Sequence, residues 1–263
     1  MELHSPTLSA AELEHWKEQG YVSLGHVVAP TQIEALCERI DAIMLGEVSY
    51  PDMRMQLCPS AGDAEKARQT RSFKGASLKY RKIEQLERDN LFLAYMQCAL
   101  FADITTKILG NEVSCYRAMF MNKPAGQGVL LNWHQDGAGH WGLTIAPQVT
   151  IWTALDDTST ANGCLHIVPG SHKFLVTPGR DSLGPEQIAV HAPLDKQLAL
   201  EMAGGEVVLL HNWTLHSSQA NQTDRPRRAF STCYLDAATR HKETGESFPQ
   251  LFPIVPQVVV GPI

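Results

Sequence analysis

Several features that would assign this chain to other protein classes are missing from its sequence. No run of uninterrupted apolar residues reaches the roughly 18 that a membrane-spanning helix needs, and the N-terminus has no apolar signal region. An excess of positive charge is also absent: 22 Lys and Arg against 28 Asp and Glu leave a net charge of −6. This balance argues against a nucleic acid or an anionic membrane as partner.

Paired cysteines are missing as well. The six cysteines lie far apart in the chain, so their spacing matches neither a zinc knuckle nor a disulfide framework. They are Cys37, Cys58, Cys98, Cys115, Cys164 and Cys233. We therefore expect reduced thiols, the cytoplasm as the compartment, and a small molecule rather than a membrane or nucleic acid as the partner.

The first 110 residues favour helices. Ser9 followed by Glu12 forms a capping box, which predicts the start of a helix. The other elements expected here are a short strand at 20–28, a helix at 29–45, a loop or lid at 46–77 and helical spacing at 83–109.

From about residue 111 the chain changes to short apolar runs separated by turn residues. Such runs indicate a sandwich or jelly roll rather than alternating strands and helices. We expect a mainly β fold with flanking α-helices, in one domain spanning residues 1–263. Its parts are a mostly helical layer and lid at 1–110, a jelly-roll core at 111–240 and an extended tail at 241–263.

The stretch "LNWHQDGAGHW" contains a candidate pair of metal ligands. His134 and Asp136 are two residues apart, so on a strand both side chains point the same way. A third ligand must come from a distant strand; His216 is the preferred candidate and His211 its rival. Two imidazoles and one carboxylate suit Fe(II) and leave positions for a co-substrate and O₂, whereas structural zinc sites have four protein ligands and favour thiolates.

An arginine follows His216 at a distance that suits a dicarboxylate co-substrate. Arg227 lies eleven residues further on, across a turn and in the next apolar run. The keto-acid end of 2-oxoglutarate chelates a metal, and its far carboxylate accepts a bidentate pair from a guanidinium. Each signal is weak alone, and their combination is much stronger.

These residues, together with the stretches around them, resemble the phytanoyl-CoA hydroxylase family of Fe(II)/2-oxoglutarate-dependent dioxygenases. The resemblance rests on "MFMNKPAGQG", "WHQD", "IWTALDDTSTANGCLHIVPGSHK" and "HSSQANQTDRPRRAF", and it covers nearly the whole chain. It implies a double-stranded β-helix of the cupin-like kind. It further implies that His134, Asp136 and His216 bind iron and that Arg227 binds the C5 carboxylate of 2-oxoglutarate.

The resemblance also implies a co-substrate pocket. The residues at the family's pocket-lining positions are Met119, Trp152 and Ser218. Lys79 is a looser match for a further position, where Arg81 and Lys82 serve equally well. Packing in the core explains Met119 and Trp152 as well as a pocket does.

The type of reaction and the substrate are less directly indicated by the sequence than the metal ligands are. Related halogenating enzymes have a small residue in place of the metal-binding carboxylate, so Asp136 favours hydroxylation, with succinate and CO₂ as co-products. The candidates for substrate contact are Gln127, Asn132, His140 and Trp141. We expect a small polar metabolite, and the basic residues at 79–82 and Arg117 fit either an anionic substrate or a solvated face.

Two other functions remain open from the sequence. One is a metal-dependent hydrolase or isomerase on a cupin-like barrel, and the other is a non-catalytic binding protein of the same fold. Arg227 and the lack of an obvious general base near the His134 and Asp136 pair argue against the first. The intact set of candidate ligands argues against the second.

Overall fold

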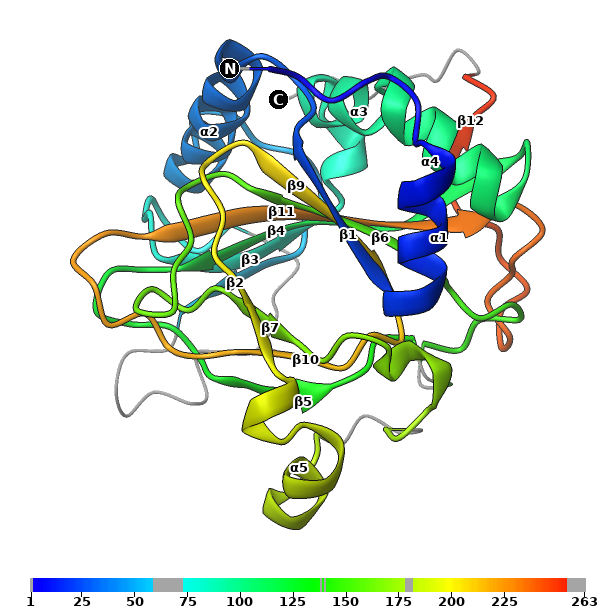
Figure 1. Ribbon diagram of the computed structural model, residues 1–263. Coiled ribbons are helices and arrows are strands. Elements are labelled where there is room, and N and C mark those ends of the chain that lie inside the picture. Colours follow the sequence, from blue (N-terminus) through cyan, green and yellow to red (C-terminus); the bar gives the residue numbers. More distant parts are fainter. Residues whose placement is uncertain (1, 59–72, 138, 140, 178–181, 255–263) are drawn as a thin grey trace.

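Two antiparallel β-sheets face each other, and helices cover the outer face of the larger one (Figure 1). This computed structural model describes residues 2–58, 73–137, 139, 141–177 and 182–254. Within them the fold is mainly β with flanking α-helices, as the sequence predicted. The facing sheets form the jelly roll expected for the middle of the chain.

The larger sheet has the strand order β1-β9-β6-β11-β4-β3-β2, and β12 pairs with one end of β4. Its strands are β1 (Tyr21–His26), β2 (Met55–Leu57), β3 (Tyr80–Glu84), β4 (Val113–Lys123), β6 (Val149–Ala154), β9 (Glu206–His211), β11 (Arg227–Asp236) and β12 (Gln250–Phe252). The smaller sheet has the order β5-β10-β7-β8. Its strands are β5 (Leu131–His134), β7 (Leu165–Ile167), β8 (Leu198–Leu200) and β10 (His216–Ser218).

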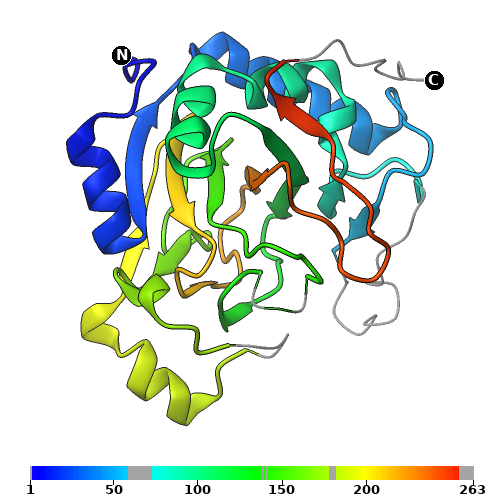
Figure 2. The same cartoon turned by 90° about the vertical axis from the view of Figure 1, so that its right-hand side faces the viewer.

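The helices divide between the two sides of the molecule. Four lie toward the large sheet: α1 (Ala10–Gln19), α2 (Pro30–Leu45), α3 (Asn90–Met96) and α4 (Ala99–Leu109). Figure 2 shows α5 (Pro185–His191), in yellow-green, on the opposite side, below the small sheet. Three single 3₁₀ turns are η2 (Leu86–Arg88), η3 (Ser171–Lys173) and η4 (Leu194–Lys196).

Alternation along the central strands builds two apolar layers. Successive side chains of a strand point to opposite faces. Accordingly, Val207 and Leu209 of β9 join the core under the helices, whereas Val208 and Leu210 join the layer between the sheets. All four are buried, and burial of such a side chain stabilises the fold by about 1.5–3 kcal/mol. The sheet is thus held rigidly on its outer face while its inner face is free to line a site.

The sequence predicted the first helix correctly. Ser9 and Glu12 form the expected capping box, and Gly20 ends α1 in the left-handed conformation, with φ of 75°. The prediction was wrong for part of the following segment. Residues 46–77 contain strand β2, and residues 83–109 begin in β3 and then divide into η2, α3 and α4, with Gly110 ending α4 as expected. Residues 59–72 of the expected lid lie outside the described part.

Within the described residues, no single helix is long and apolar enough to cross a membrane. Only α3 and α4 taken together, bent by 56° at their junction, reach that length and composition. Both helices place large side chains such as Phe92 and Phe101 in the core under the large sheet.

A buried carboxyl group in η2 makes stability depend on pH. The Oε2 atom of Glu87 is buried and has no hydrogen-bond partner in the described structure. Burial raises the pKa of Glu87 from 4.5 to about 7. The folded protein therefore holds this proton more tightly than the unfolded chain, and the group favours folding less as pH rises from 4.5 to 7.

We expect Glu87→Gln to remove this dependence. The variant stays neutral, so its free energy of unfolding should exceed that of wild type by at most about 3 kcal/mol at pH 8, with the gap closing toward pH 5. Urea unfolding at both pH values measures this gap. Glu14→Gln, at an exposed carboxylate, is the control. If both variants follow the same pH profile, Glu87 is not the group responsible.

Candidate active site

Three side chains, two from neighbouring strands and one from the turn after the first strand, converge between the sheets. His134 ends β5, His216 begins β10, and the two residues are register partners across this strand pair. Their ring centroids lie 4.2 Å apart, and Nε2 of His134 is 3.8 Å from Oδ1 of Asp136. One ligand atom from each of the three residues lies within 4.8 Å of the others, so the three could hold one metal ion. Strand β5 ends at His134, and Asp136 reaches the same place from the turn that follows.

Backbone carbonyl groups fix the orientation of both imidazoles. Nδ1 of His134 donates to the carbonyl of Asn132 at 2.7 Å, and Nδ1 of His216 donates to the carbonyl of Thr214 at 2.9 Å. A carbonyl only accepts, so each Nδ1 carries the proton and each Nε2 has its lone pair free for a metal. Burial, and next the neighbouring His134, lower the pKa of His216, which keeps its imidazole neutral.

The residue between the first two candidate ligands anchors them to the rest of the fold. Gln135 is 1% exposed, and its Nε2 donates to the carbonyls of Phe174 and Trp213 at 2.7 and 2.6 Å. Its Oε1 accepts from the backbone N–H groups of Val176 and Thr177 at 2.7 and 3.1 Å. Sequence reasoning missed this residue, because its role depends on segments far away in the chain.

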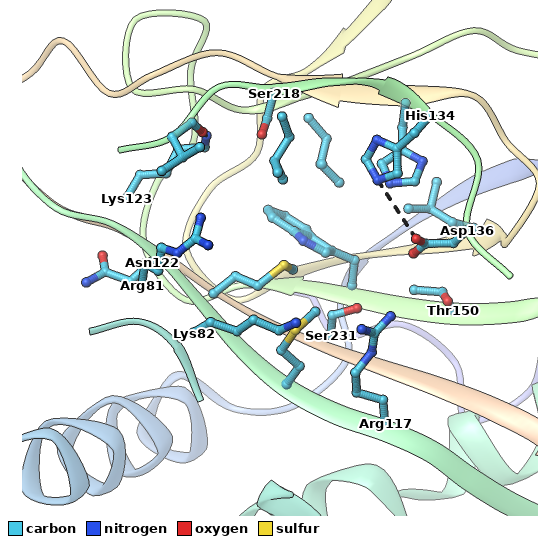
Figure 3. A pocket seen from close by; sticks show the side chains of 18 of the residues that line it. Arg81, Lys82, Arg117, Asn122, Lys123, His134, Asp136, Thr150, Ser218 and Ser231 are labelled. Carbon is cyan, nitrogen blue, oxygen red and sulfur yellow. Dashed lines mark hydrogen bonds and ion pairs between the residues drawn. The ribbon is translucent and has the colours of Figure 1, made fainter. Parts of the chain in front are cut away.

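The cluster opens into a cavity of about 280 Å³ between the two sheets. Met119, Trp152, Ser218 and Arg227 all line this cavity together with the three candidate ligands, as the family resemblance implied. Figure 3 shows His134 and Asp136 on one side of the cavity and Lys123 across from them.

Arg227 is a buried cation without an acidic partner in the described part of the chain. It is 3% exposed, its Nη2 donates to the carbonyl of Gly163 at 2.9 Å, and its Nε has no partner there. Burial lowers its pKa to about 10, so it remains charged at neutral pH. The buried Oγ of Ser218 and Nε1 of Trp152 also lack described partners. A carboxylate would satisfy such a set of donors, since buried polar groups normally have partners.

Lys123 is a second buried cation that sequence reasoning missed. It is the register partner of Arg227 across β4 and β11, and its Nζ donates to the carbonyl of Val129 at 2.7 Å. Burial, and then the charge of Arg227, lower the pKa of Lys123 to about 7. The only signal in the sequence was its position at the end of the run "MFMNK".

Several sequence-predicted contacts do not line the cavity. The structure brings Arg81 and Lys82 to its wall, whereas Lys79, which lies before β3, is exposed and does not reach it. Gln127, Asn132 and Trp141 do not line the cavity either, and their contact with a substrate stays a prediction. His140 lies outside the described residues.

Trp141 and Asn132 instead support the wall of the site. Trp141 is 9% exposed and stacks on Tyr116 at a centroid distance of 4.5 Å. Asn132 is exposed, and only its carbonyl acts at the site, through His134.

The rival ligand His211 lines the cavity but does not join the cluster. Its Nδ1 accepts from the backbone N–H of Trp213 at 3.0 Å, and its ring packs 5.0 Å from that of His172. Burial, followed by the charge of His172, lowers its pKa to about 4. Among the described residues, His216 is therefore the second imidazole of the metal-binding group.

Facing antiparallel sheets with a cluster of two histidines and one carboxylate between them define the class of non-haem iron oxygenases. The family model described as "Phytanoyl-CoA dioxygenase (PhyH)" matches residues 16–229. The chain therefore belongs to the phytanoyl-CoA dioxygenase family, whose members are Fe(II)/2-oxoglutarate-dependent dioxygenases.

Individual relatives agree with this family. The chain is 27% identical over 243 residues to a probable phytanoyl-CoA dioxygenase of Caenorhabditis elegans, covering 87% of this chain and 76% of that protein. It is 26% identical over 252 residues to the ectoine dioxygenase of Halomonas elongata, covering 84% and 68%.

Solved structures show the same fold at lower sequence identity. EctD from S. alaskensis, crystallised with 2-oxoglutarate and 5-hydroxyectoine, superposes with a TM-score of 0.74 at 20% identity, covering 98% of this chain and 88% of that chain. The 2-oxoglutarate-dependent carbocyclase SnoK from nogalamycin biosynthesis gives 0.69 at 20% identity, covering 92% and 90%.

We expect wild-type protein to bind one equivalent of Fe(II) in anaerobic calorimetry and His216→Ala to weaken this binding by at least about tenfold, because one of three ligands is lost. His211→Ala is the matched control, since His211 lines the same cavity from β9 of the large sheet. It should bind Fe(II) as wild type does. Equal losses in the two variants would contradict the choice of His216.

Proposed function

We propose that this protein is an Fe(II)/2-oxoglutarate-dependent hydroxylase of a small polar metabolite. The observation that carries the proposal is the pairing of two features in one cavity. A three-residue group suited to a metal shares the cavity with Arg227, a buried guanidinium with no carboxylate partner in the described structure. This is the combination that a chelating keto acid with a distant carboxylate requires.

In this proposal each side chain has one task. His134, Asp136 and His216 would hold iron. Hydrogen bonds from Nδ1 of each histidine to a backbone carbonyl keep the two imidazoles aligned. Arg227 and the Oγ of Ser218 bind the far carboxylate of 2-oxoglutarate. When bound, iron with 2-oxoglutarate and O₂ supplies the oxidation of a C–H bond, with succinate and CO₂ as co-products.

The wall of the cavity separates the reaction from water. Trp152, which is 2% exposed, and the methionine side chains of β4 provide an apolar floor between the charged ends. Exclusion of water strengthens the electrostatic interactions inside the site and suppresses side reactions.

The alternative functions fit this site less well. Asp136 is the only acidic side chain among the described residues that line the cavity, and it belongs to the metal-binding group. A hydrolase or isomerase would need a further general base, and it would leave Arg227 without a role. A silent binding protein would have no need for three aligned ligands. The presence of Asp136 likewise favours hydroxylation over halogenation.

The size of the cavity supports a small substrate. About 280 Å³ is just below the range of roughly 300–1,000 Å³ usual for ligand pockets, and here the cavity must hold the co-substrate as well. The polar groups on its walls favour a polar molecule over a long hydrocarbon chain.

The adjacent arginines of "RPRRAF" offer a test. We expect anaerobic Fe(II) and 2-oxoglutarate to give wild type a weak visible charge-transfer band. Arg227→Met should raise the Kd for 2-oxoglutarate by about 10–100-fold, because a charged hydrogen-bond partner is lost. Absence of the band in wild type would contradict the proposal.

Arg228→Met is the matched control for this titration. Arg228 points to the opposite face of β11, where it forms ion pairs with Asp156 at 2.8 Å and Asp41 at 3.0 Å. This variant should lower the Tm and leave the Kd for 2-oxoglutarate unchanged. A similar rise of this Kd in both variants would contradict the assignment of Arg227.

A further inference from the structure

The cavity is strongly cationic although the whole chain is acidic. Of the described residues that line it, five are basic and one, Asp136, is acidic, whereas the chain carries a net charge of −6. The basic residues are Arg81, Lys82, Arg117, Lys123 and Arg227. Buried cations are costly without a counter-charge, so such a lining indicates anionic ligands. Under the proposed function, 2-oxoglutarate provides one free carboxylate, which Arg227 binds.

The remaining cations are not all near Arg227. Along β4, the alternate residues Arg117, Met119, Met121 and Lys123 line the cavity, and Asn122 lines it as well. Lys123 is the register partner of Arg227, whereas Arg117 is six residues earlier, which corresponds to about 20 Å of extended strand. A five-carbon diacid bound at Arg227 is too short to reach both ends. Arg117 therefore belongs to a second charged region of the cavity.

Lys82 completes this second region. It lies on β3, whose residues Lys82 and Glu84 are register partners of Met121 and Met119. Figure 3 shows Lys82 and Arg117 on the same wall of the cavity, with Lys123 and Arg81 further along it.

One carboxylate inside the wall holds the second region together without neutralising it. Glu84 lies 2.7 Å from Nζ of Lys82, 3.7 Å from Nη1 of Arg117 and 3.7 Å from Nη1 of Arg54. Three cations around one carboxylate leave an excess of positive charge. Glu84 does not itself line the cavity, so the surplus faces the ligand side.

Aromatic rings hold the guanidinium of Arg117 in place. Its Cζ lies 4.6 Å from the ring centroid of Trp141 and 5.5 Å from that of Tyr116, and these two rings are stacked on each other. Such cation–π contacts orient the planar group before a ligand arrives, which lowers the entropic cost of binding. An exposed arginine that served only solubility would not need this support.

We propose that Arg117 and Lys82 form a subsite for an anionic group, a carboxylate or a phosphate, on the substrate to be oxidised. The inference rests on the proposed function, because it assigns Arg227 to the co-substrate. It narrows the substrate from a polar metabolite to an anionic one. Binding of the anion at Arg117 positions a neighbouring part of the molecule toward Asp136 and the two histidines.

The test uses small probes and needs no knowledge of the substrate. Protein loaded anaerobically with Fe(II) and 2-oxoglutarate is titrated with acetate, inorganic phosphate or neutral acetamide, and the intrinsic tryptophan fluorescence, to which Trp141 beside Arg117 contributes, reports binding. We expect a saturable change with at least one anion and none with acetamide. The anion that binds more tightly identifies the class of the group. Equal responses to acetamide and to both anions would overturn the proposal.

Variants separate this subsite from the co-substrate site. Arg117→Met should weaken the anion by at least about tenfold, while Arg117→Lys should retain part of the affinity. Arg225→Met, at an exposed arginine outside the cavity lining, should behave as wild type. An unchanged anion affinity in Arg117→Met would overturn the proposal.

The charge-transfer band of the same samples distinguishes the two proposals. Arg117→Met should leave the Kd for 2-oxoglutarate unchanged; a loss of 2-oxoglutarate binding would show that Arg117 serves the co-substrate, and this inference would be wrong. If wild type shows no band, the proposed function fails. The fluorescence titration with acetate then still shows whether an anion binds at Arg117.

Discussion

The pairing of β5 with β10 is the constraint on which the site depends. It places His134 and His216 opposite each other in register, so their rings meet on one face of the small sheet. Short strands of three or four residues cannot supply such precision alone. The large sheet, fixed by the apolar layer under the helices, supplies the rigid wall against which the small sheet is positioned. The apolar core under the helices thus stabilises the fold, whereas the small sheet carries the histidines of the site.

Buried charges on the inner face of the large sheet lower the stability of the fold, and apolar packing on its outer face offsets this loss. Arg227 and Lys123 are buried register partners, and burial together with the charge of Arg227 lowers the pKa of Lys123. On the opposite side of the same strand, Phe230 packs against Phe92 at a centroid distance of 4.8 Å. The core under the helices therefore supports an inner surface that is less stable without a bound anion than with one.

The parts of the site that sequence could predict are those carried by residue type and local spacing. His134 with Asp136, and His216 with Arg227, lie within short stretches, and the structure brings all four to one cavity. The choice among neighbouring basic residues could not be made from the sequence, because it depends on where β3 begins: Lys79 precedes the strand, whereas Arg81 and Lys82 lie on it and line the cavity. Strand β3 has no apolar alternation that would reveal it. The packing of Trp141 could not be predicted either, because its partners Tyr116 and Arg117 come from another strand, β4.

Gln135 links the metal-binding group to a segment that never touches it. Its amide oxygen holds the N–H groups of Val176 and Thr177, and its amide nitrogen holds the carbonyl of Trp213. Local opening of residues 174–177 must break the hydrogen bonds of Gln135 to Phe174, Val176 and Thr177, and so loosen the residue between His134 and Asp136. By linkage, a ligand that favours the closed arrangement also protects the amide hydrogens of this segment from exchange with solvent. One buried amide side chain thus links order in this segment to order at the metal-binding group.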